Sequence, residues 1–200
     1  RNNSMRGKLI AVEGLDGAGL TTQATMLRNY LINKGNDTIL TKEPTDGLIG
    51  GLIKSCLRKE WKTSPSALQM LFAADRAHHL ATEIEPALKK SKNVISDRYI
   101  LSSITYGSVD IPQPVLQQLN ANFRKPHVTF IIDTQPAVCI DRIKKSRHHV
   151  ELFEDEQRMQ ALRKIFLSLK KLFPETYVID GNRAPDEVFK DVQKIIAKMP

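Results

Sequence analysis

The stretch LIAVEGLDGAGLTT, residues 9–22, decides the fold of this chain. It begins as an apolar run and continues into closely spaced glycines followed by two threonines. From Gly14 onward it fits the phosphate-binding loop pattern G-x-x-x-x-G-K-[ST] at every fixed position but one, because Leu20 stands in the place of the lysine. The stretch therefore predicts a strand, a glycine loop and a helix that begins near residue 20, which is the setting such a loop requires.

Glycines in the loop let successive backbone N–H groups point into one concavity, and the positive end of the following helix extends it. Thr21 stands where the motif's hydroxyl binds Mg²⁺, and Thr22 can donate to a phosphate. Loss of the lysine at Leu20 removes one charge near the transferred phosphate but leaves the backbone cradle. Another cation must therefore replace it, or transfer must be slow. The alternative is a tight glycine turn without a ligand.

Four more short apolar runs alternate with helical patterns along the chain. The five predicted strands are residues 8–12, 37–41, 93–96, 128–133 and 177–180. Apolar residues at helical spacing over 48–57 and 162–172, and prolines at 65, 136 and 185, predict helices between the strands. We expect a single α/β domain over residues 5–200, with a five-stranded, mostly parallel sheet between two helical layers. Residues 1–4 are expected to be a remnant from upstream of that domain.

The composition is ordinary for a globular protein, with 41% hydrophobic and 26% charged residues. No apolar run approaches the roughly 18 residues that cross a membrane, and no signal-peptide core is present, so a cytoplasmic location is expected. Cys56 and Cys139 are expected to be buried free thiols. The net charge of +8 suits nucleic-acid binding or a polyanionic small substrate equally, and decides nothing alone.

Two further stretches carry candidate site residues. In ISDRY, residues 95–99, Asp97 ends a predicted strand, where it can hold Mg²⁺, and Arg98 can fork onto a phosphate. In MLFAADRAHH, residues 70–79, Phe72 and Arg76 share one helix face, which suits stacking on a base and recognition of its edge. Taken singly, the first fits a surface ion pair, and the second fits a core phenylalanine beside a solvated arginine.

Together with TKEPTDG (41–47) and SDRYILSSITY (96–106), in this order and spacing, these stretches resemble the thymidylate kinase family. The resemblance covers nearly the whole chain, from Lys8 to IDGNRAPDEV (179–188), and its most specific parts are the DRY and F-x-x-x-R stretches. It implies a three-layer fold of the P-loop NTPase type. It also implies ATP and Mg²⁺ as cofactors and dTMP as the acceptor.

The resemblance assigns a role to each site residue. ATP would be bound by Gly14, Leu15, Asp16, Gly17, Ala18, Gly19, Leu20, Thr21, Thr22, Asn182 and Arg183. The acceptor would be bound by Lys42, Glu43, Phe72, Arg76, Arg98, Ser103 and Tyr106. Thr21 and Asp97 would hold the metal, and the catalytic residues would be Asp16, Arg98 and Arg147.

Within the acceptor site, the resemblance implies that Phe72 stacks on thymine and that Arg76 donates to its exocyclic oxygen. Ser103 would lie near the base edge, and the Tyr106 ring would crowd a 2′-hydroxyl. Asp16 would reach the 3′-hydroxyl of the sugar or tune the phosphate site.

Four positions depart from the family's pattern. Besides Leu20, Lys42 stands where arginine is common, and Gly107 follows Tyr106 where many members have glutamine. Gly17 occupies the place of an arginine that some members carry in the loop. Members without it supply positive charge from a mobile lid, which here would be the segment around 142–154.

The lid segment is basic, and its candidate cations are Arg142, Lys144, Lys145 and Arg147, of which Arg147 is the best single candidate. These side chains would fold over ATP and supply the charge that Leu20 lacks, together with Arg98. A solvated helix end with basic residues is the alternative.

The predicted reaction is in-line phosphoryl transfer from ATP to dTMP, giving ADP and dTDP. Three alternatives stay open: a weak or inactive nucleotide-binding pseudokinase, favoured by Leu20; a nucleic-acid-binding domain, favoured by the charge alone; and a monophosphate kinase of broader acceptor range. We expect ATP and dTMP as partners, neither nucleic acid nor membrane, and a homodimer as is typical of the family. The helix that begins near Ser64 and the helix after Ile111 offer apolar surface for that dimer.

Overall fold

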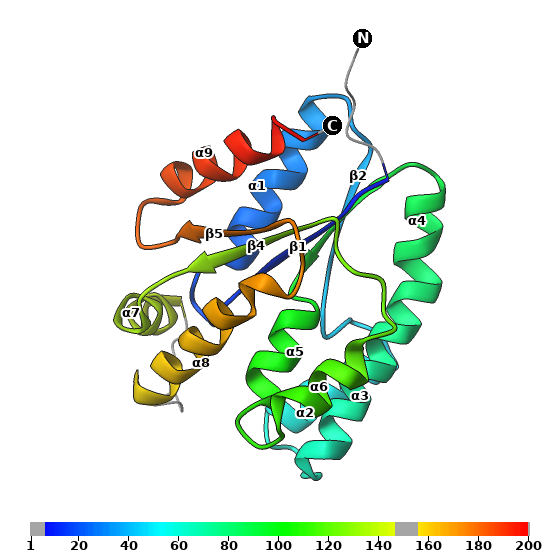
Figure 1. Cartoon of the computed structure of the whole chain (residues 1–200), viewed down its shortest axis with the longest axis vertical. Coiled ribbons are helices and arrows are strands. Elements are labelled where there is room, and N and C mark those ends of the chain that lie inside the picture. Colours follow the sequence, from blue (N-terminus) through cyan, green and yellow to red (C-terminus); the bar gives the residue numbers. More distant parts are fainter. Residues whose placement is uncertain (1–6, 147–155, 200) are drawn as a thin grey trace.

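Five apolar runs pair into one sheet at the centre of the structure, a computed structural model that describes residues 7–146 and 156–199 (Figure 1). The strands are β1 (Leu9–Gly14), β2 (Thr38–Lys42), β3 (Asn93–Asp97), β4 (Val128–Asp133) and β5 (Thr176–Asp180). Their order in the sheet is β2-β3-β1-β4-β5, and every pair of neighbouring strands in the described residues is parallel. All five predicted strands are confirmed, and the expected mostly parallel sheet is wholly parallel.

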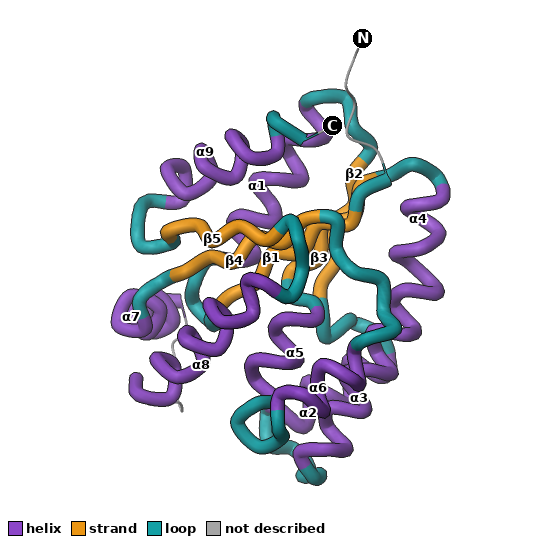
Figure 2. Tube along the Cα trace, in the orientation of Figure 1, coloured by secondary structure: helices purple, strands orange, loops and turns teal. Residues whose placement is uncertain are grey.

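Helices connect the strands and cover both faces of the sheet. They are α1 (Leu20–Asn33), α2 (Leu48–Leu57), α3 (Pro65–His79), α4 (Glu85–Lys89), α5 (Ile100–Gly107), α6 (Gln113–Asn120), α7 (Pro136–Ser146), α8 (Glu156–Ser168) and α9 (Pro185–Ile196). A π-helical turn, η1 (Leu80–Ile84), joins α3 to α4, and a 3₁₀ turn, η2 (Leu169–Lys171), follows α8. In Figure 2, α1 and α9 lie on one side of the sheet, and α5 and α8 lie on the other. The three-layer α/β prediction is therefore confirmed.

Local sequence signals explain where several helices begin and end. The Ser64 hydroxyl accepts a hydrogen bond of 3.1 Å from the backbone N–H of Ala67, and Pro65 occupies the first turn of α3. Gly35 follows α1 with a φ of 79°, a left-handed conformation that glycine adopts without strain. Prolines also stand in the first turns of α7 and α9, as the sequence predicts.

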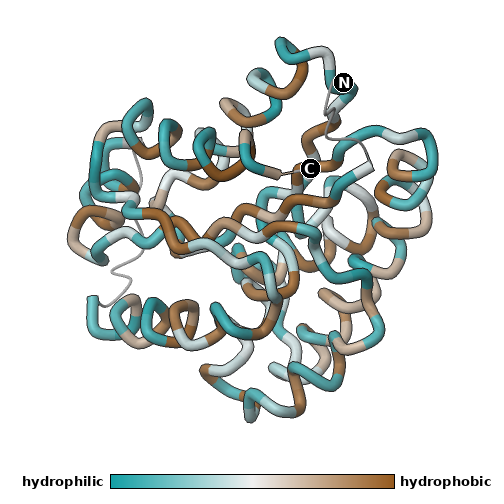
Figure 3. Tube along the Cα trace, turned by 45° about the horizontal axis from the view of Figure 1, so that its top comes forward, coloured by the Kyte–Doolittle hydropathy of each residue, from teal (hydrophilic) through white to brown (hydrophobic). Residues whose placement is uncertain are grey.

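The core lies along the strands because helices shield the sheet on both faces. The β1 residues Leu9, Ile10, Ala11 and Val12 are all buried, so the strand is apolar on both sides instead of alternating. Figure 3 shows hydrophobic residues gathered along the strands and hydrophilic ones on the outer turns of the helices. Cys139 is buried in this core, whereas Cys56 on α2 is partly exposed, so the expectation of two buried thiols is right only for Cys139. Neither cysteine forms a disulfide.

The strand order reverses around β1, because the chain first crosses to β2 and β3 on one side and then to β4 and β5 on the other. In open parallel sheets, ligands collect at the carboxyl ends of the strands beside such a point. Gly14, Asp97 and Lys42 all end strands at this edge. None of the helices in the described part of the chain is long and apolar enough to span a bilayer.

Candidate active site

The glycine loop runs from the end of β1 to the start of α1, and its backbone requires glycine. Gly17 and Gly19 have φ values of 78° and 96°, in the left-handed region. A Cβ on Gly17 would lie 2.5 Å from the carbonyl oxygen of Cys139 on α7, so the loop packs directly against that helix. Gly19 caps α1 without a side-chain hydrogen bond, which leaves the first N–H groups of the helix open to an anion.

Leu20, in the place of the motif's lysine, is the first residue of α1 and is only 5% exposed. Its side chain folds back toward β1, with Cδ2 3.2 Å from where a Cβ of Gly14 would lie. The residue thus belongs to the hydrophobic core and also forms an apolar wall of the loop. No cation comes from this position.

A cavity of about 550 Å³ opens in front of the loop; we call it the loop cavity. It is lined by Leu15, Asp16, Gly17, Gly19, Leu20, Thr21, Thr22, Asp97, Arg98, Arg142 and Ile143. Its two basic residues are Arg98, which follows β3, and Arg142, which lies on α7. The fold thus places most of the predicted ATP-binding residues around one cavity.

Arg142 is the described lid candidate that lies at the loop. Its guanidinium donates to the carbonyl oxygens of Ala18 (3.3 Å) and Gly181 (3.0 Å), which joins the glycine loop to the loop after β5. Lys144 and Lys145 are exposed and do not line the loop cavity, and Lys145 pairs with Asp141 on its own helix. Arg147 and the rest of the predicted lid to residue 154 lie outside the described residues.

Thr21 and Asp97 meet at the rim of the loop cavity, as predicted for a metal site. The Thr21 hydroxyl donates to Oδ2 of Asp97 at 2.5 Å. A hydroxyl and a carboxylate oxygen are the hard donors that Mg²⁺ prefers when phosphates complete its coordination, so the pair fits that ion. Within the described residues, no cluster of three or more His, Cys, Asp or Glu side chains is arranged to hold a metal without such help.

Arg98 links the loop to α5. It has a φ of 70°, unusual for a residue with a side chain. Its Nη1 donates to the carbonyl oxygen of Gly14 at 2.9 Å, and its Nη2 forms an ion pair with Asp16. The guanidinium carbon also lies 5.5 Å from the centre of the Tyr106 ring, whose hydroxyl accepts from the backbone N–H of Asp16.

Burial alone would lower the pKa of Arg98, but the phenol of Tyr106 and the carboxylates of Asp16, Asp97 and Glu13 outweigh that effect and raise it. The side chain therefore remains a cation at every physiological pH. The alternative of ion pairs with other residues is met in part, because Arg98 pairs with Asp16, whereas Asp97 accepts from the hydroxyl of Thr21; all four residues line the loop cavity.

Glu13, which no sequence motif marks as a site residue, holds the start of α5. Its carboxylate accepts from the backbone N–H groups of Leu101 (2.9 Å) and Ser102 (3.1 Å) and from the Ser102 hydroxyl. Burial raises the pKa of Glu13 to about 7, although the Ser102 hydrogen bonds and the charge of Arg98 oppose the rise. A carboxylate inside an otherwise apolar strand was the signal that could have identified it.

A second cavity, of about 260 Å³, lies between α3 and α5; we call it the α3–α5 cavity. Its lining includes six of the seven predicted acceptor residues, namely Glu43, Phe72, Arg76, Arg98, Ser103 and Tyr106. It also includes Gln69, Gly107 and Arg158, which the sequence analysis does not assign to a site. The helical spacing of Gln69 to Phe72 and Arg76 was a signal for the first of these.

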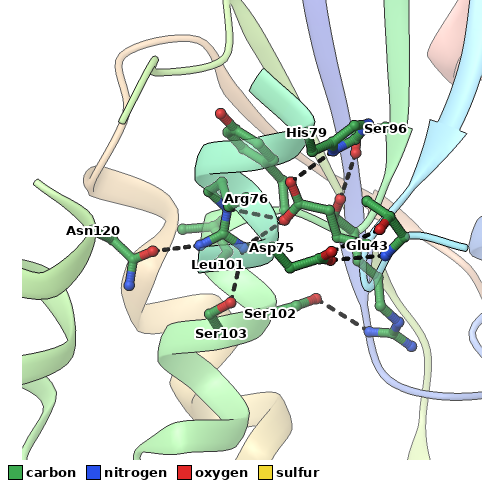
Figure 4. Close-up of polar contacts among 12 residues, drawn as sticks. Glu43, Asp75, Arg76, His79, Ser96, Leu101, Ser102, Ser103 and Asn120 are labelled. Carbon is green, nitrogen blue, oxygen red and sulfur yellow. Dashed lines mark hydrogen bonds and ion pairs between the residues drawn. The ribbon is translucent and has the colours of Figure 1, made fainter. Parts of the chain in front are cut away.

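Arg76 is buried, with 1% exposure, and anchors a polar network beneath this cavity (Figure 4). Its Nε and Nη2 donate to Oε2 of Glu43 at 2.9 and 2.6 Å, Nη2 also donates to Ser103 at 2.9 Å, and Nη1 donates to Asn120. Four of its five N–H groups are therefore engaged. The alternative of a solvated arginine is wrong, and the predicted contact with a base has one N–H left to make it.

Glu43 is central to this network and lies between Arg76 and His79 (Figure 4). Its Oε1 lies 3.0 Å from Nδ1 of His79, and both side chains are buried. Lys42, the neighbouring predicted acceptor residue, points elsewhere. It pairs with Asp46 at 3.2 Å and lines a different cavity beside Thr21 and Asp97.

The last two predicted ATP-binding residues, Asn182 and Arg183, lie on the loop after β5 with different surroundings. Arg183 lines a small cavity beside Ala18, Gly19 and Arg142, and pairs with Asp191. Asn182 does not line that cavity; its Oδ1 accepts from the backbone N–H of Gln135 at 2.8 Å. The Asn182 side chain therefore joins the loop after β5 to the segment that follows β4.

The loop cavity and the α3–α5 cavity meet, because Asp16 and Arg98 line both. The cavity in front of the glycine loop thus adjoins, at Arg98, a second cavity that is lined by the Phe72 ring and the buried guanidinium of Arg76. This arrangement suits phosphoryl transfer between two nucleotides. Comparison with known proteins gives the same answer.

The family model described as thymidylate kinase matches residues 12–192. The chain belongs to the thymidylate kinase family. It is 39% identical over 191 residues to a probable thymidylate kinase of Pyrobaculum calidifontis, covering 94% of this chain and 95% of that relative. Probable thymidylate kinases of Pyrococcus horikoshii and Methanosarcina barkeri are 34% and 37% identical, with 96% of this chain and 97% of each relative covered.

Membership of the thymidylate kinase family supports ATP-dependent phosphorylation of dTMP, with ATP as phosphate donor and generally a divalent metal. The chain is thus a nucleotide-binding transferase that serves dTTP synthesis.

Proposed function

We propose that ATP binds with its phosphates in the loop cavity, that dTMP binds in the α3–α5 cavity, and that the phosphoryl group passes between them beside Arg98. The observation that carries this proposal is that Asp16 and Arg98 line both cavities. The Phe72 ring and the remaining N–H of Arg76 suit a base. With the base bound there, the acceptor phosphate would lie at the end of the cavity where Arg98 stands. Catalysis is then mainly positioning and charge neutralisation.

In this mechanism the chain's own residues act by holding the two phosphates. Backbone N–H groups of the glycine loop and of the first turn of α1 donate to the ATP phosphates. Arg98, fixed by Asp16 and by the carbonyl oxygen of Gly14, aligns the acceptor phosphate. Thr21 and Asp97 would hold Mg²⁺, which when bound neutralises charge on the ATP phosphates.

We further propose that arginines take over the charge that Leu20 lacks. Arg142 supports this role because it lies at the loop cavity and spans the glycine loop and the loop after β5. Arg98 supplies a second cation from the acceptor side. The lid around 142–154, with Arg147, would close over ATP and add to them, within a single domain over residues 5–200.

The experiment is a coupled assay of ATP consumption across a panel of nucleoside monophosphates. ATP consumption that depends on added dTMP supports the proposal, and its absence with retained ATP binding supports the pseudokinase alternative. Turnover of other monophosphates at similar kcat/KM would instead support the broader acceptor range.

Replacement of Arg142 tests the charge assignment. Arg142→Met should lower kcat about 100-fold while KM for dTMP changes little, because the lost cation acts during transfer. Arg147→Ala should act in the same direction if the lid contributes. Arg124→Met removes an arginine that pairs with Glu85 outside both cavities and should leave kcat unchanged. Equal activity of the Arg142 and Arg124 variants would contradict the assignment.

We also propose a homodimer, for which an exposed apolar surface on neighbouring helices offers the contact. Leu48 and Leu52 on α2, Met70 on α3 and Val115 on α6 are all exposed. Burial of such residues is a common driving force of association. Sedimentation of Met70→Glu beside the unaltered chain tests it, since the variant should shift toward the monomer.

A further inference from the structure

One buried polar group of the α3–α5 cavity lacks a hydrogen-bond partner in the described part of the chain. Gln69 on α3 is 7% exposed, and its side-chain oxygen Oε1 accepts no hydrogen bond from the described residues. Buried polar atoms are normally satisfied, so an orphaned acceptor that lines a cavity points to a ligand as its donor.

The position of Gln69 on α3 supports this. Gln69 precedes Phe72 by three residues and Arg76 by seven, so the three side chains lie along one face of the helix. All three line the α3–α5 cavity. A flat ring stacked on Phe72 would therefore have Arg76 toward one end and Gln69 toward the other.

Gly107, on the facing helix α5, makes room for the amide. A Cβ on Gly107 would lie 2.9 Å from Cδ of Gln69 and 3.0 Å from both terminal methyl carbons of Leu116. Any side chain at position 107 would therefore push the Gln69 amide away. The Gln69 amide can therefore occupy this place only because residue 107 has no side chain.

The donors and acceptors of the cavity match one kind of base edge. Arg76 has one N–H left, and Ser103 accepts from Arg76, so its own hydroxyl proton can donate. Both suit carbonyl oxygens of a base. The orphaned oxygen of Gln69 needs an N–H, and a 2,4-dioxopyrimidine such as thymine carries its imide N3–H between two carbonyl groups.

We propose that Gln69 is a specificity-determining residue of the acceptor site, whose Oε1 accepts the N3–H of a 2,4-dioxopyrimidine nucleotide. This proposal rests on the proposed binding of dTMP in the α3–α5 cavity. Gln69 selects the acceptor by leaving a buried oxygen unpaired whenever the base has no N–H at that place.

The test compares dTMP with its N3-methyl analogue in the unaltered chain and in Gln69→Met, which keeps the length of the side chain and removes the amide. The unaltered chain should prefer dTMP by at least about 100-fold in kcat/KM. Gln69→Met should lose about 10-fold or more of kcat/KM for dTMP while the N3-methyl analogue changes little, so the preference shrinks.

Thr129→Val is the matched control, because it removes another buried oxygen without a partner in the described residues, on β4 outside the cavity. It should leave the preference unchanged. An equal fall for both nucleotides in Gln69→Met means a packing role and overturns the proposal, as does no change for either. If the unaltered chain turns over no dTMP, the proposed function fails, and calorimetric binding of the same two nucleotides tests Gln69 separately.

Gly107→Ala provides a second variant should Gln69→Met fold poorly. It should also reduce the preference for dTMP, because the new Cβ displaces the amide. In a Gln69→Ala background the same change should have no further effect on the preference, since no amide remains to displace. Independent, additive effects of the two substitutions would overturn the proposed coupling.

Discussion

The two halves of the site are built from different materials. The loop cavity includes a backbone cradle, made by glycines with left-handed φ and by the open start of α1, whose N–H groups we propose as donors to the ATP phosphates. The α3–α5 cavity depends on side chains, with buried Arg76 held by Glu43, Ser103 and Asn120. A backbone cradle survives a side-chain replacement such as Leu20, whereas a buried charged network fails when one member is lost. Three predictions test this difference.

The largest effect is expected in the side-chain half, from Glu43→Gln. This change leaves buried Arg76 without its carboxylate, and breaking such a pair destabilises proteins by about 3–5 kcal/mol. KM for dTMP should rise more than KM for ATP, because Glu43 and Arg76 line the α3–α5 cavity and do not line the loop cavity. Urea unfolding and steady-state kinetics measure both effects.

Glu60→Gln is the control, because Glu60 also pairs with an arginine, Arg58, but both are exposed. It should leave stability nearly unchanged. A loss of similar size in the two variants would remove the distinction between buried and exposed pairs on which the comparison depends.

The second effect concerns Glu13, which connects the two halves of the site. It lies on β1 directly before the glycine loop, and its carboxylate caps the start of α5, which lines the α3–α5 cavity. Burial raises its pKa to about 7 in the folded chain, against 4.5 for the ordinary group. A raised pKa means that the folded state binds the proton more tightly. Its contribution to stability is therefore present below pH 4.5 and lost as the pH rises through 7.

That loss amounts to about 3 kcal/mol for a shift of this size. Glu13→Gln has no proton to lose, so its stability relative to the unaltered chain should rise by about that amount between pH 4.5 and 8. Urea unfolding at several pH values measures the difference. A difference that stays constant with pH would show that Glu13 keeps an ordinary pKa in the folded chain.

The smallest effect is expected in the backbone half, from Leu20→Lys. The added ammonium should raise kcat by up to about 10-fold if the missing charge limits transfer, because charge near the phosphoryl group acts in the transition state. The apolar packing of Leu20 is lost, so a modest decrease in stability should accompany it. A large fall in kcat would mean that the loop is as intolerant of side-chain change as the α3–α5 cavity.

The same division explains what could be predicted from the sequence. The strands, the glycine loop and the start of α3 follow from local patterns, because their causes lie within a few neighbouring residues. The surroundings of Arg76 do not, because Glu43 is 33 and Asn120 is 44 positions away in the chain. Helical spacing brought Phe72 and Arg76 to one face but could not reveal that four of the five N–H groups are already engaged.

The site itself was predicted unevenly for the same reason. Thr21 and Asp97 come together as expected, because β1 and β3 end at one edge of the sheet. Asp16 and Arg98, both named as catalytic, form an ion pair that was not predicted. Lys42 faces a different cavity, and Glu13 and Gln69 were missed, because the orientation of a side chain depends on the elements packed around it. The roles assigned to these residues remain predictions.

Arg98 combines a charge at the meeting point of two cavities with a φ of 70°. Holding a residue with a Cβ in that conformation costs about 1 kcal/mol or more, and glycine would remove this strain. Glycine would also remove the ion pair with Asp16, the hydrogen bond to Gly14 and the guanidinium that we propose aligns the acceptor phosphate. The strained backbone and the charge at the meeting point of the cavities therefore come together, and a substitution chosen only to relax the backbone would remove both.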